Sequence, residues 1–339
     1  MARRTTWAGC ALIALTLAPE SSHADAPVIV KIGTVAPEDT PWAKQAYRVK
    51  RQLEHGSKRR LKVKVYLSAI LGDEVSLVRQ CRDGDIQVVG TSTGAFAAEI
   101  PEIGLLELPY LFLSQREADT VLDEMFDDFA ALFRERGFIL AYWTENGWRS
   151  FATKDRAIRS AADLAGLRMR AQESPVHVDL YKELGAIPRA IGVGEVLSSI
   201  QTGIVDGFDN TPLFTFATSW YQGIRHFTLT EHMYQPAMVV YSKKFVDSLP
   251  PALVPMLTAH RKRENAWARR GVRELTPALL RNFQRTGITV TRLTAAERAA
   301  LARAMRPVHD RYRASVGPRG VALYDKVETI LRRLRKSAR

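Results

Sequence analysis

The sequence has 339 residues, of which 46% are hydrophobic, 25% charged and 9% aromatic. This composition is typical of a globular protein and excludes intrinsic disorder and a collagen-like architecture. Lysine and arginine number 49 against 36 acidic residues, a formal net charge of +13. The excess indicates anionic surroundings or ligands, but it does not distinguish nucleic acid, a membrane surface or small acids.

The first 26 residues have the pattern of a secretory signal peptide. Arg3 and Arg4 precede an apolar run over 7–17, and small residues follow over 22–26. The run, roughly 11 residues long, is shorter than the roughly 20 residues that a membrane-spanning helix needs. We therefore expect cleavage near Ala26 and export to the periplasm rather than a transmembrane protein.

The two cysteines favour a protein without disulfides. Cys10 lies in the signal region, so Cys81 would be the only cysteine of the mature chain, and no internal bridge could form. The segment WAGC at 7–10 precedes most of the apolar run, which argues against a lipidation site at Cys10.

Apolar, β-branched runs alternate with runs of helical period in the first half of the chain, which predicts an α/β fold. A threonine–proline pair at 40–41, typical of a helix start, supports the first helix. Successive strand–helix units predict a parallel sheet. We expect strands over 28–34, 61–67, 86–90 and 138–143, and helices over 41–56, 73–84 and 117–136.

The second half begins with a smaller α/β unit. After Gly147, short strands are expected over 148–152, 167–171, 188–191 and 205–208, separated by helices such as 195–202. Beyond it, 237–241 is strand-like, a long helical stretch runs from 250 to about 285, and the rest is mostly helix. Because no repeat or low-complexity linker occurs, we expect extended crossings between the two lobes.

The motifs of common catalytic and metal sites are absent from the sequence. The seven histidines are scattered, and no HExxH, CxxC, EF-hand or GxSxG spacing occurs. Gly192 and Gly194 lack both the third glycine of a dinucleotide fingerprint and the GK[ST] of a phosphate loop. The sequence therefore predicts no enzyme, no metal and no cofactor.

Three arginines are more informative. The alternation of a strand places Arg168 and Arg170 on one face, and no acid lies between residues 164 and 172 to pair with them. Arg149 alternates onto the face of Phe151 in the same way. An interior guanidinium without a protein acid can hold a carboxylate through two parallel hydrogen bonds, so an anion clamp is one interpretation. A solvated sheet face is the other.

Five short motifs occur in the order found in a known protein family. They resemble the signatures of the DctP-type substrate-binding proteins of TRAP (tripartite ATP-independent periplasmic) transporters, over about residues 28–290. The motifs are KIGTVAP (31–37), LGDE (71–74), DLAGLRMR (163–170), QTGIVDGFDNTP (201–212) and SKKFVDSLP (242–250).

This resemblance implies a two-lobed type II periplasmic-binding-protein fold. Lobe 1 would comprise 27–147 with a return segment over 236–290, lobe 2 would comprise 148–235, and the helices of 291–339 would pack on both lobes. Such a protein captures an organic acid in the cleft between its lobes and delivers it to the membrane subunits of the transporter. It is not an enzyme and does not bind nucleic acid.

The resemblance also implies roles for individual residues. The principal carboxylate-binding arginine of the family falls on Arg170, a second basic contact on Arg149, and an amide hydrogen-bond donor on Asn210. Arg168 lies outside the critical position and is expected to serve as scaffold.

The aromatic segment 211–221 leaves the nature of the ligand open. It resembles a branch of the family that works with tetratricopeptide-repeat partner proteins and whose members are suspected of binding apolar or lipid-like ligands. Retention of the arginines favours an acid, and Phe214, Phe216, Trp220 and Tyr221 could then cover an apolar body, which favours aromatic or medium-chain acids. Packing of a buried helix is the alternative for these aromatic side chains.

Overall fold

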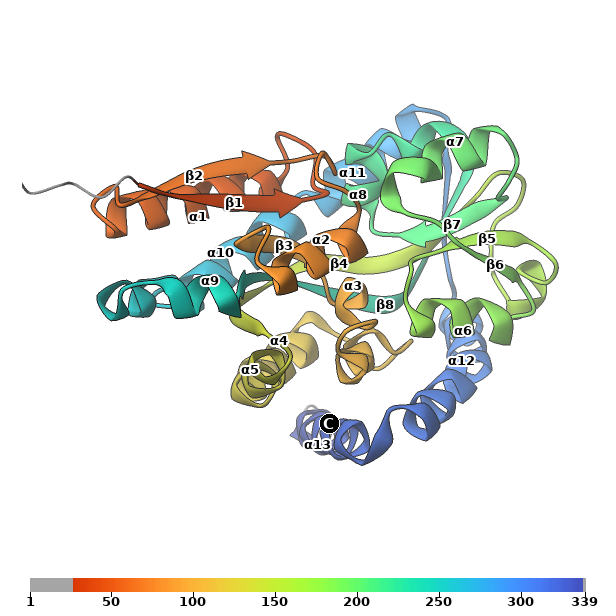
Figure 1. Ribbon diagram of the computed structural model, residues 1–339. Coiled ribbons are helices and arrows are strands. Elements are labelled where there is room, and N and C mark those ends of the chain that lie inside the picture. Colours follow the sequence, from red (N-terminus) through yellow and green to blue (C-terminus); the bar gives the residue numbers. More distant parts are fainter. Residues whose placement is uncertain (1–26, 338–339) are drawn as a thin grey trace, which may run out of the picture.

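The computed structural model describes residues 27–337. The expected signal peptide, residues 1–26 with Cys10, lies outside the described residues. Within 27–337, no helix combines the length and the apolarity needed to cross a bilayer. Two lobes share one sheet, with β1 and β2 at one end of the molecule and β5, β6 and β7 at the other (Figure 1).

The described residues form one mixed sheet in the order β2-β1-β3-β8-β4-β7-β5-β6, with β9 alongside β8. β1 pairs in parallel with β2 and β3, and β5 pairs in parallel with β6 and β7, as the strand–helix units predict. The strands are β1 (Val28–Thr34), β2 (Leu61–Tyr66), β3 (Val88–Ser92), β4 (Phe138–Thr153), β5 (Arg168–Ala171), β6 (Ile187–Ala190), β7 (Gly207–Asn210), β8 (His226–Ser242) and β9 (Thr289–Arg292).

Two long antiparallel strands, β4 and β8, connect the lobes. They pair along their length and are the extended crossings that the missing linker predicts. The prediction of separate strands over 138–143 and 148–152 is wrong, because both belong to β4. The intervening Asn-Gly pair suggests a turn, but Gly147, at φ +103°, sits at a register shift of the β4–β8 ladder, so the strand continues past it.

The helices cover the sheet and close the ends of the molecule. Thr40 caps α1 by accepting a hydrogen bond from the backbone of Ala43, as its position predicts. The α-helices are α1 (Pro41–Gly56), α2 (Glu74–Asp83), α3 (Thr93–Phe96), α4 (Gln115–Glu124), α5 (Phe126–Glu135), α6 (Pro175–Glu183), α7 (Val196–Gln201), α8 (Pro212–Ala217), α9 (Lys243–Ser248), α10 (Arg261–Arg273), α11 (Thr276–Arg285), α12 (Ala295–Ser315) and α13 (Gly317–Ser337).

Two predicted helices are divided. The helix expected over 117–136 breaks at Met125 into α4 and α5. The stretch expected from 250 to about 285 contains a 3-10 helix, Pro251–Leu257, followed by α10 and α11. Pro277 lies in the first turn of α11, where the missing amide hydrogen costs nothing and favours a new helix start.

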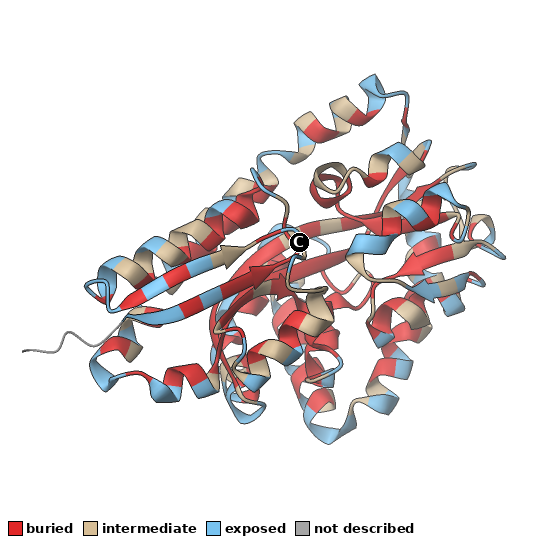
Figure 2. Ribbon diagram, turned by 45° about the horizontal axis from the view of Figure 1, so that its top comes forward, coloured by how far each residue is buried: buried red, intermediate tan, exposed pale blue. Residues whose placement is uncertain are grey.

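The C-terminal helices lie on both lobes. α12 packs on α6 of lobe 2, and α13 packs on α4 of lobe 1 (Figure 1). The sheet that the two lobes share is buried along its middle strands (Figure 2).

Cys81 of α2 is fully buried, and this burial raises the pKa of its thiol, so the side chain is a core group.

Candidate functional site

Strand β5 carries two arginines on one face, and their surroundings differ. Arg168 pairs with Asp206, whose carboxylate oxygens lie 2.5 Å from Nη2 and 3.0 Å from Nε. Arg170, two residues further on, is only 2% exposed. No carboxylate in the described part of the chain forms an ion pair with Arg170, whose guanidinium donates one hydrogen bond, from Nε to the carbonyl oxygen of Ile191 at 2.8 Å.

The charge of Arg170 is poorly compensated by the protein. Its guanidinium carbon lies 5.3 Å from the centroid of the Trp220 ring, a cation–π contact. Burial, together with the nearby positive charge of Arg149, lowers the pKa of Arg170 to about 10. Because a buried cation without an anion is costly, this position favours an anionic group from outside the chain.

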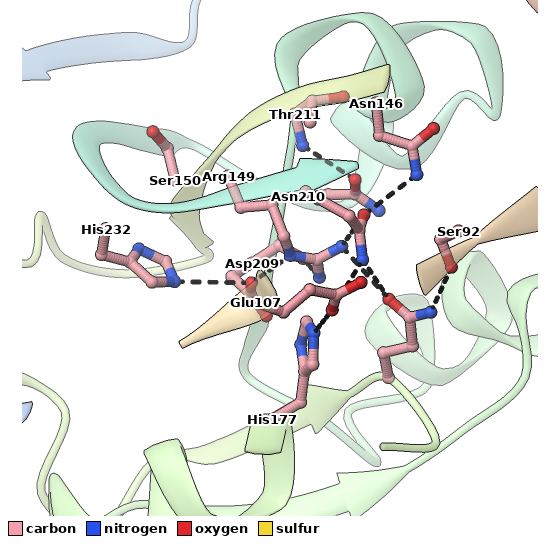
Figure 3. Close-up of polar contacts among 12 residues, drawn as sticks. Ser92, Glu107, Asn146, Arg149, Ser150, His177, Asp209, Asn210, Thr211 and His232 are labelled. Carbon is pink, nitrogen blue, oxygen red and sulfur yellow. Dashed lines mark hydrogen bonds and ion pairs between the residues drawn. The ribbon is translucent and has the colours of Figure 1, made fainter. Parts of the chain in front are cut away.

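Arg149 of β4 is equally buried, at 1% exposed, but it already has a counter-ion. Its Nε lies 2.5 Å from a carboxylate oxygen of Asp209 on the neighbouring strand β7, and its Nη2 donates to the carbonyl oxygen of the same residue. Nη1 donates to Gln235 at 2.8 Å. Figure 3 shows Arg149 at the centre of these contacts. Arg149 therefore braces the crossing strands and can add only part of its charge to a ligand.

Further buried groups contact the Asp209 carboxylate of this ion pair. Tyr181 donates a hydrogen bond to Asp209 at 2.7 Å, and His232 Nε2 lies 3.5 Å from the same carboxylate. Burial alone would raise the pKa of Asp209, but the charge of Arg149 and the nearby histidines hold it well below its ordinary value. Asp209 therefore stays ionised, and the pair is stable at neutral pH.

A second buried carboxylate, Glu107, lies next to this pair. It contacts His177 at 2.5 Å and accepts hydrogen bonds from Thr93 and Gln235 (Figure 3). Burial works to raise the pKa of Glu107, but the hydrogen bond and charge of His177 outweigh it and lower the pKa. Glu107 therefore adds negative charge on the Arg149 side of the layer, whereas the charges of Asp209 and Glu74 act on Arg170 only without a direct ion pair.

A cavity of about 40 Å³ lies beside this layer, between the lobes. It is too small for an organic acid, since one water molecule alone needs roughly 10–15 Å³. Its polar lining includes Thr34, Glu74, Thr91 and Ser92 of lobe 1 and Asn146 of β4, and its apolar lining includes Trp42, Phe214 and several aliphatic side chains. The cavity as it stands therefore has no room for such a ligand.

Gln172 separates this cavity from the arginines. It follows β5, and its Nε2 donates across the cleft to Ser92 at 2.7 Å and to Glu74 at 3.2 Å. Its Oε1 accepts hydrogen bonds from Gln235 at 2.8 Å and from Arg149 at 3.4 Å. Gln172 thus links lobe 2 to lobe 1 between this cavity and Arg149.

Of the other predicted site residues, only Trp220 contacts Arg170 directly. Asn210, 4% exposed, ends β7 and uses its Oδ1 to accept from the backbone of Thr211. Trp220, 1% exposed, lies below Arg170 and packs on Phe214 at 5.4 Å between ring centroids. Phe214 is the only one of the five predicted site residues that lines the cavity.

The aromatic segment does not face the cleft as a whole. Phe216 and Tyr221 stack on each other at 5.2 Å, and both approach Phe283 of α11. These two rings therefore belong to the packing of lobe 2 against α11, and only the Phe214–Trp220 pair lies toward the arginines.

Sequence reasoning missed Gln172, Ser92, Asn146 and the site role of Glu74. Gln172 had a signal, because it lies two residues after Arg170 and the strand alternation puts both on one face. Glu74 belongs to the LGDE motif but was not assigned a role. Within residues 27–337, no group of three or more His, Cys, Asp or Glu side chains is arranged to hold a metal ion.

Comparison with known proteins gives a consistent result. The sequence model of the bacterial extracellular solute-binding proteins, family 7 (DctP), matches residues 32–315. A solute-binding protein of Verminephrobacter eiseniae is 33% identical over 203 residues, which span 60% of this chain and 61% of that relative. The 2,3-diketo-L-gulonate-binding periplasmic protein YiaO of Escherichia coli is 28% identical over 82% of this chain and 84% of its own.

A solved structure shows the same fold. The TRAP periplasmic solute-binding protein of Polaromonas sp. JS666, bound to D-erythronate, superposes with a TM-score of 0.82 at 28% identity, covering 88% of this chain and 98% of that one. This likeness supports the two-lobed type II arrangement of the crossing strands and lobes (Figure 1).

Proposed function

The chain belongs to family 7 of the bacterial extracellular solute-binding proteins, the DctP family, and on this premise we propose that it captures an organic acid, as the carboxylate, in the cleft between its lobes. The family and its structural relatives are solute-binding proteins of transport systems rather than enzymes. In the proposal the loaded protein delivers the acid to the membrane subunits of a TRAP transporter.

The observation that carries this proposal is the uncompensated charge of Arg170. Its guanidinium is buried, has no carboxylate partner among residues 27–337 and has a lowered pKa. A ligand carboxylate would supply the missing anion through two parallel, charge-assisted hydrogen bonds. Arg149 would add long-range attraction while keeping its bond to Asp209.

Closure of the lobes would complete the site. Arg170 comes from lobe 2, whereas Glu74 and Ser92 come from lobe 1 and meet it across the cleft through Gln172. An entering acid would take the place of the Gln172 contacts and join the two lobes itself. Exclusion of water on closure strengthens the arginine–carboxylate pair, and the closed shape would signal loading to the transporter.

The polar lining favours a hydroxylated acid. Thr34, Thr91, Ser92 and Asn146 line the cavity with hydrogen-bonding groups that an aromatic or aliphatic chain would leave unused. Two relatives support this choice, since one is named for 2,3-diketo-L-gulonate and one is bound to D-erythronate, whereas another is named for C4-dicarboxylates. Aromatic or medium-chain acids have weaker support, because only the Phe214 side of the aromatic segment lies at the cleft.

Native mass spectrometry of protein purified without refolding tests the proposal first, because a trapped acid would show its mass. A thermal-shift screen should then compare D-erythronate, succinate and phenylacetate with the uncharged amides of the same acids. We expect D-erythronate to give the largest shift and the amides to lose most of it, since they leave Arg170 buried without an anion. The largest shift for phenylacetate would favour an acid with an apolar body instead.

An apolar or lipid-like ligand, handled with a tetratricopeptide-repeat partner, is the second candidate. Trp42 and Phe214, whose ring centroids are 5.7 Å apart, give the cavity an aromatic wall that would suit it. The same screen separates the candidates, because equal shifts for acids and amides would support the apolar ligand and contradict the carboxylate clamp.

We propose the periplasm as the place of action. The similar protein from Escherichia coli is named as periplasmic, and the N-terminal pattern predicts cleavage near Ala26. N-terminal sequencing of the exported protein is expected to begin close to residue 27. A mature form that begins at Cys10 and carries a lipid would contradict this proposal.

A further inference from the structure

The net charge of the chain is unevenly distributed within lobe 1. Residues 27–66 contain ten bases and three acids, whereas residues 67–147 contain five bases and fifteen acids. The first segment therefore carries a net charge of +7 in 40 residues, whereas the second carries −10. The first segment comprises β1, α1 and β2, at the end of the molecule opposite β5, β6 and β7 (Figure 1).

The bases gather where α1 ends and β2 begins. We call this set the basic tip; its members are Arg51, Lys58, Arg59, Arg60 and Lys62. All five are exposed, and none forms an ion pair with another described residue. Other exposed bases of the same lobe, such as Arg79 and Arg134, also form no ion pair with the described residues, but they do not lie together in one turn. The basic tip thus keeps its charge available for a partner outside the chain.

The backbone of this turn is unfavourable for the residues it carries. Lys58 and Arg59 have φ angles of 52° and 64°, in the left-handed region that glycine or asparagine prefers. Two consecutive long side chains at such angles cost stability, and a residue held there against its preference points to a function. The turn is fixed by backbone hydrogen bonds from residues 58, 59 and 60 to residues 55, 54 and 57.

The basic tip also borders a hollow and two exposed apolar side chains. The hollow, of about 530 Å³, is lined by Arg51, Arg59 and Lys62 together with His55, Glu54 and two apolar residues. Val28 and Ile29, 50% and 41% exposed, pair in register with Leu61 and Lys62 on β2. Basic side chains around exposed apolar ones form a pattern that suits the interface of a bilayer.

We propose that the basic tip docks on an anionic phospholipid surface, with lipid phosphates at its bases and Val28 and Ile29 in contact with the interface. A fluid bilayer offers many phosphates at no fixed spacing, which flexible side chains without fixed partners can meet together. Because the basic tip lies at the far end of lobe 1, docking there leaves the cleft open to solvent. The protein would then find its ligand and its transporter from a position at the membrane.

Co-sedimentation with vesicles tests this proposal. The purified protein is mixed at physiological ionic strength with vesicles of phosphatidylcholine, alone or with phosphatidylglycerol. We expect binding only to the mixed vesicles, and loss of that binding at high salt. Replacing Lys58, Arg59 and Arg60 by Gln should weaken binding about fivefold for each base, or on the order of 100-fold together.

A matched control removes the same charge elsewhere. Lys182, Arg225 and Arg285 are exposed and form no ion pair with the described residues. Their replacement by Gln should leave vesicle binding within about twofold, because they lie away from the proposed interface. An equal loss in this control would show that net charge alone drives binding and would overturn the proposal.

A second variant distinguishes a loss of vesicle binding from a loss of folding. Lys58→Gly with Arg59→Gly relieves the left-handed strain, so Tm should rise by roughly a few degrees while vesicle binding falls. Binding to pure phosphatidylcholine as strong as to the mixed vesicles would overturn the proposal. So would binding that appears only when the vesicles carry membrane proteins, since this would assign the basic tip to a protein partner.

Discussion

The region around Arg149 and the region around Arg170 are equally buried but differ in charge balance. Arg149 has Asp209 as its counter-ion, with Gln235 and Gln172 as further hydrogen-bond acceptors. Arg170 has one backbone carbonyl and the face of Trp220. Burial alone therefore does not distinguish the two arginines, whereas the presence or absence of an ion pair does. The first region supports the crossing strands, and the second is the one that our proposal assigns to the ligand carboxylate.

The largest effect on stability should come from removing the counter-ion of Arg149. Asp209→Asn leaves Arg149 buried without its ion-pair partner and should lower the free energy of unfolding by about 3–5 kcal/mol. Urea denaturation measures this. Asp206→Asn is the matched control, because it removes the partner of the half-exposed Arg168 and should cost less than about 1 kcal/mol. Equal losses in the two variants would remove the distinction between the regions.

Removing the charge of Arg170 should have the opposite effect and raise the stability of the ligand-free protein. The pKa of Arg170 in the folded protein is lowered to about 10 from its ordinary 12.5. Keeping the charged form buried therefore costs stability at every pH below about 10, and the cost fades as the pH rises further. Arg170→Met should raise the ligand-free free energy of unfolding by up to about 3 kcal/mol.

Arg149→Met is the control for that variant. This variant leaves Asp209 buried without its ion-pair partner and should destabilise the protein strongly. Urea denaturation again measures the effect. If both methionine variants lowered the stability by similar amounts, Arg170 would be as well compensated as Arg149, and the comparison would fail.

The same pKa gives a pH dependence of binding. Affinity for the acid should be constant near neutral pH and fall about tenfold per unit above about pH 10, where the guanidinium of the free protein loses its proton. In Arg170→Lys the fall should begin at lower pH, because burial lowers an ordinary lysine pKa of about 10.4. Titration calorimetry in alkaline buffer checks this, and an unchanged midpoint in the lysine variant would contradict it.

The smallest effect concerns the link between the lobes. Gln172→Ala removes the hydrogen bonds to Ser92 and to Gln235, and it should lower the ligand-free stability by about 1 kcal/mol. Gln222→Ala, at an exposed position, is the control and should change nothing measurable. A loss as large as that of Asp209→Asn would place Gln172 in the structural layer rather than at the ligand site.

The fold was largely predictable because its local signals agree. β1 and α1 have the predicted bounds, since alternation and the Thr40 cap act over short ranges. The length of β8 was not predictable. The expected strand covered only 237–241, whereas His226–Ser242 is strand, because residues such as Thr230 and His232 interrupt the apolar pattern yet are buried in the polar layer.

The sequence showed which arginines share a strand face, but not which of them have a counter-ion. Period 2 placed Arg168 and Arg170 together, yet the sequence could not show that Asp206, 38 residues after Arg168, would neutralise only the first. The counter-ion of Arg149 is 60 residues away, on another strand. Charge compensation in this protein is set by pairing across β4, β5 and β7, which no local pattern reveals.

The most direct test is calorimetry of Arg170→Ala with D-erythronate, or with whichever acid gives the largest thermal shift. The account predicts a loss of about 2–5 kcal/mol, roughly 30-fold or more in affinity. Arg170→Lys should recover only part of it, because an ammonium restores the charge without the two parallel bonds. Unchanged affinity of the alanine variant would show that the buried, uncompensated arginine does not hold the ligand and would contradict the account.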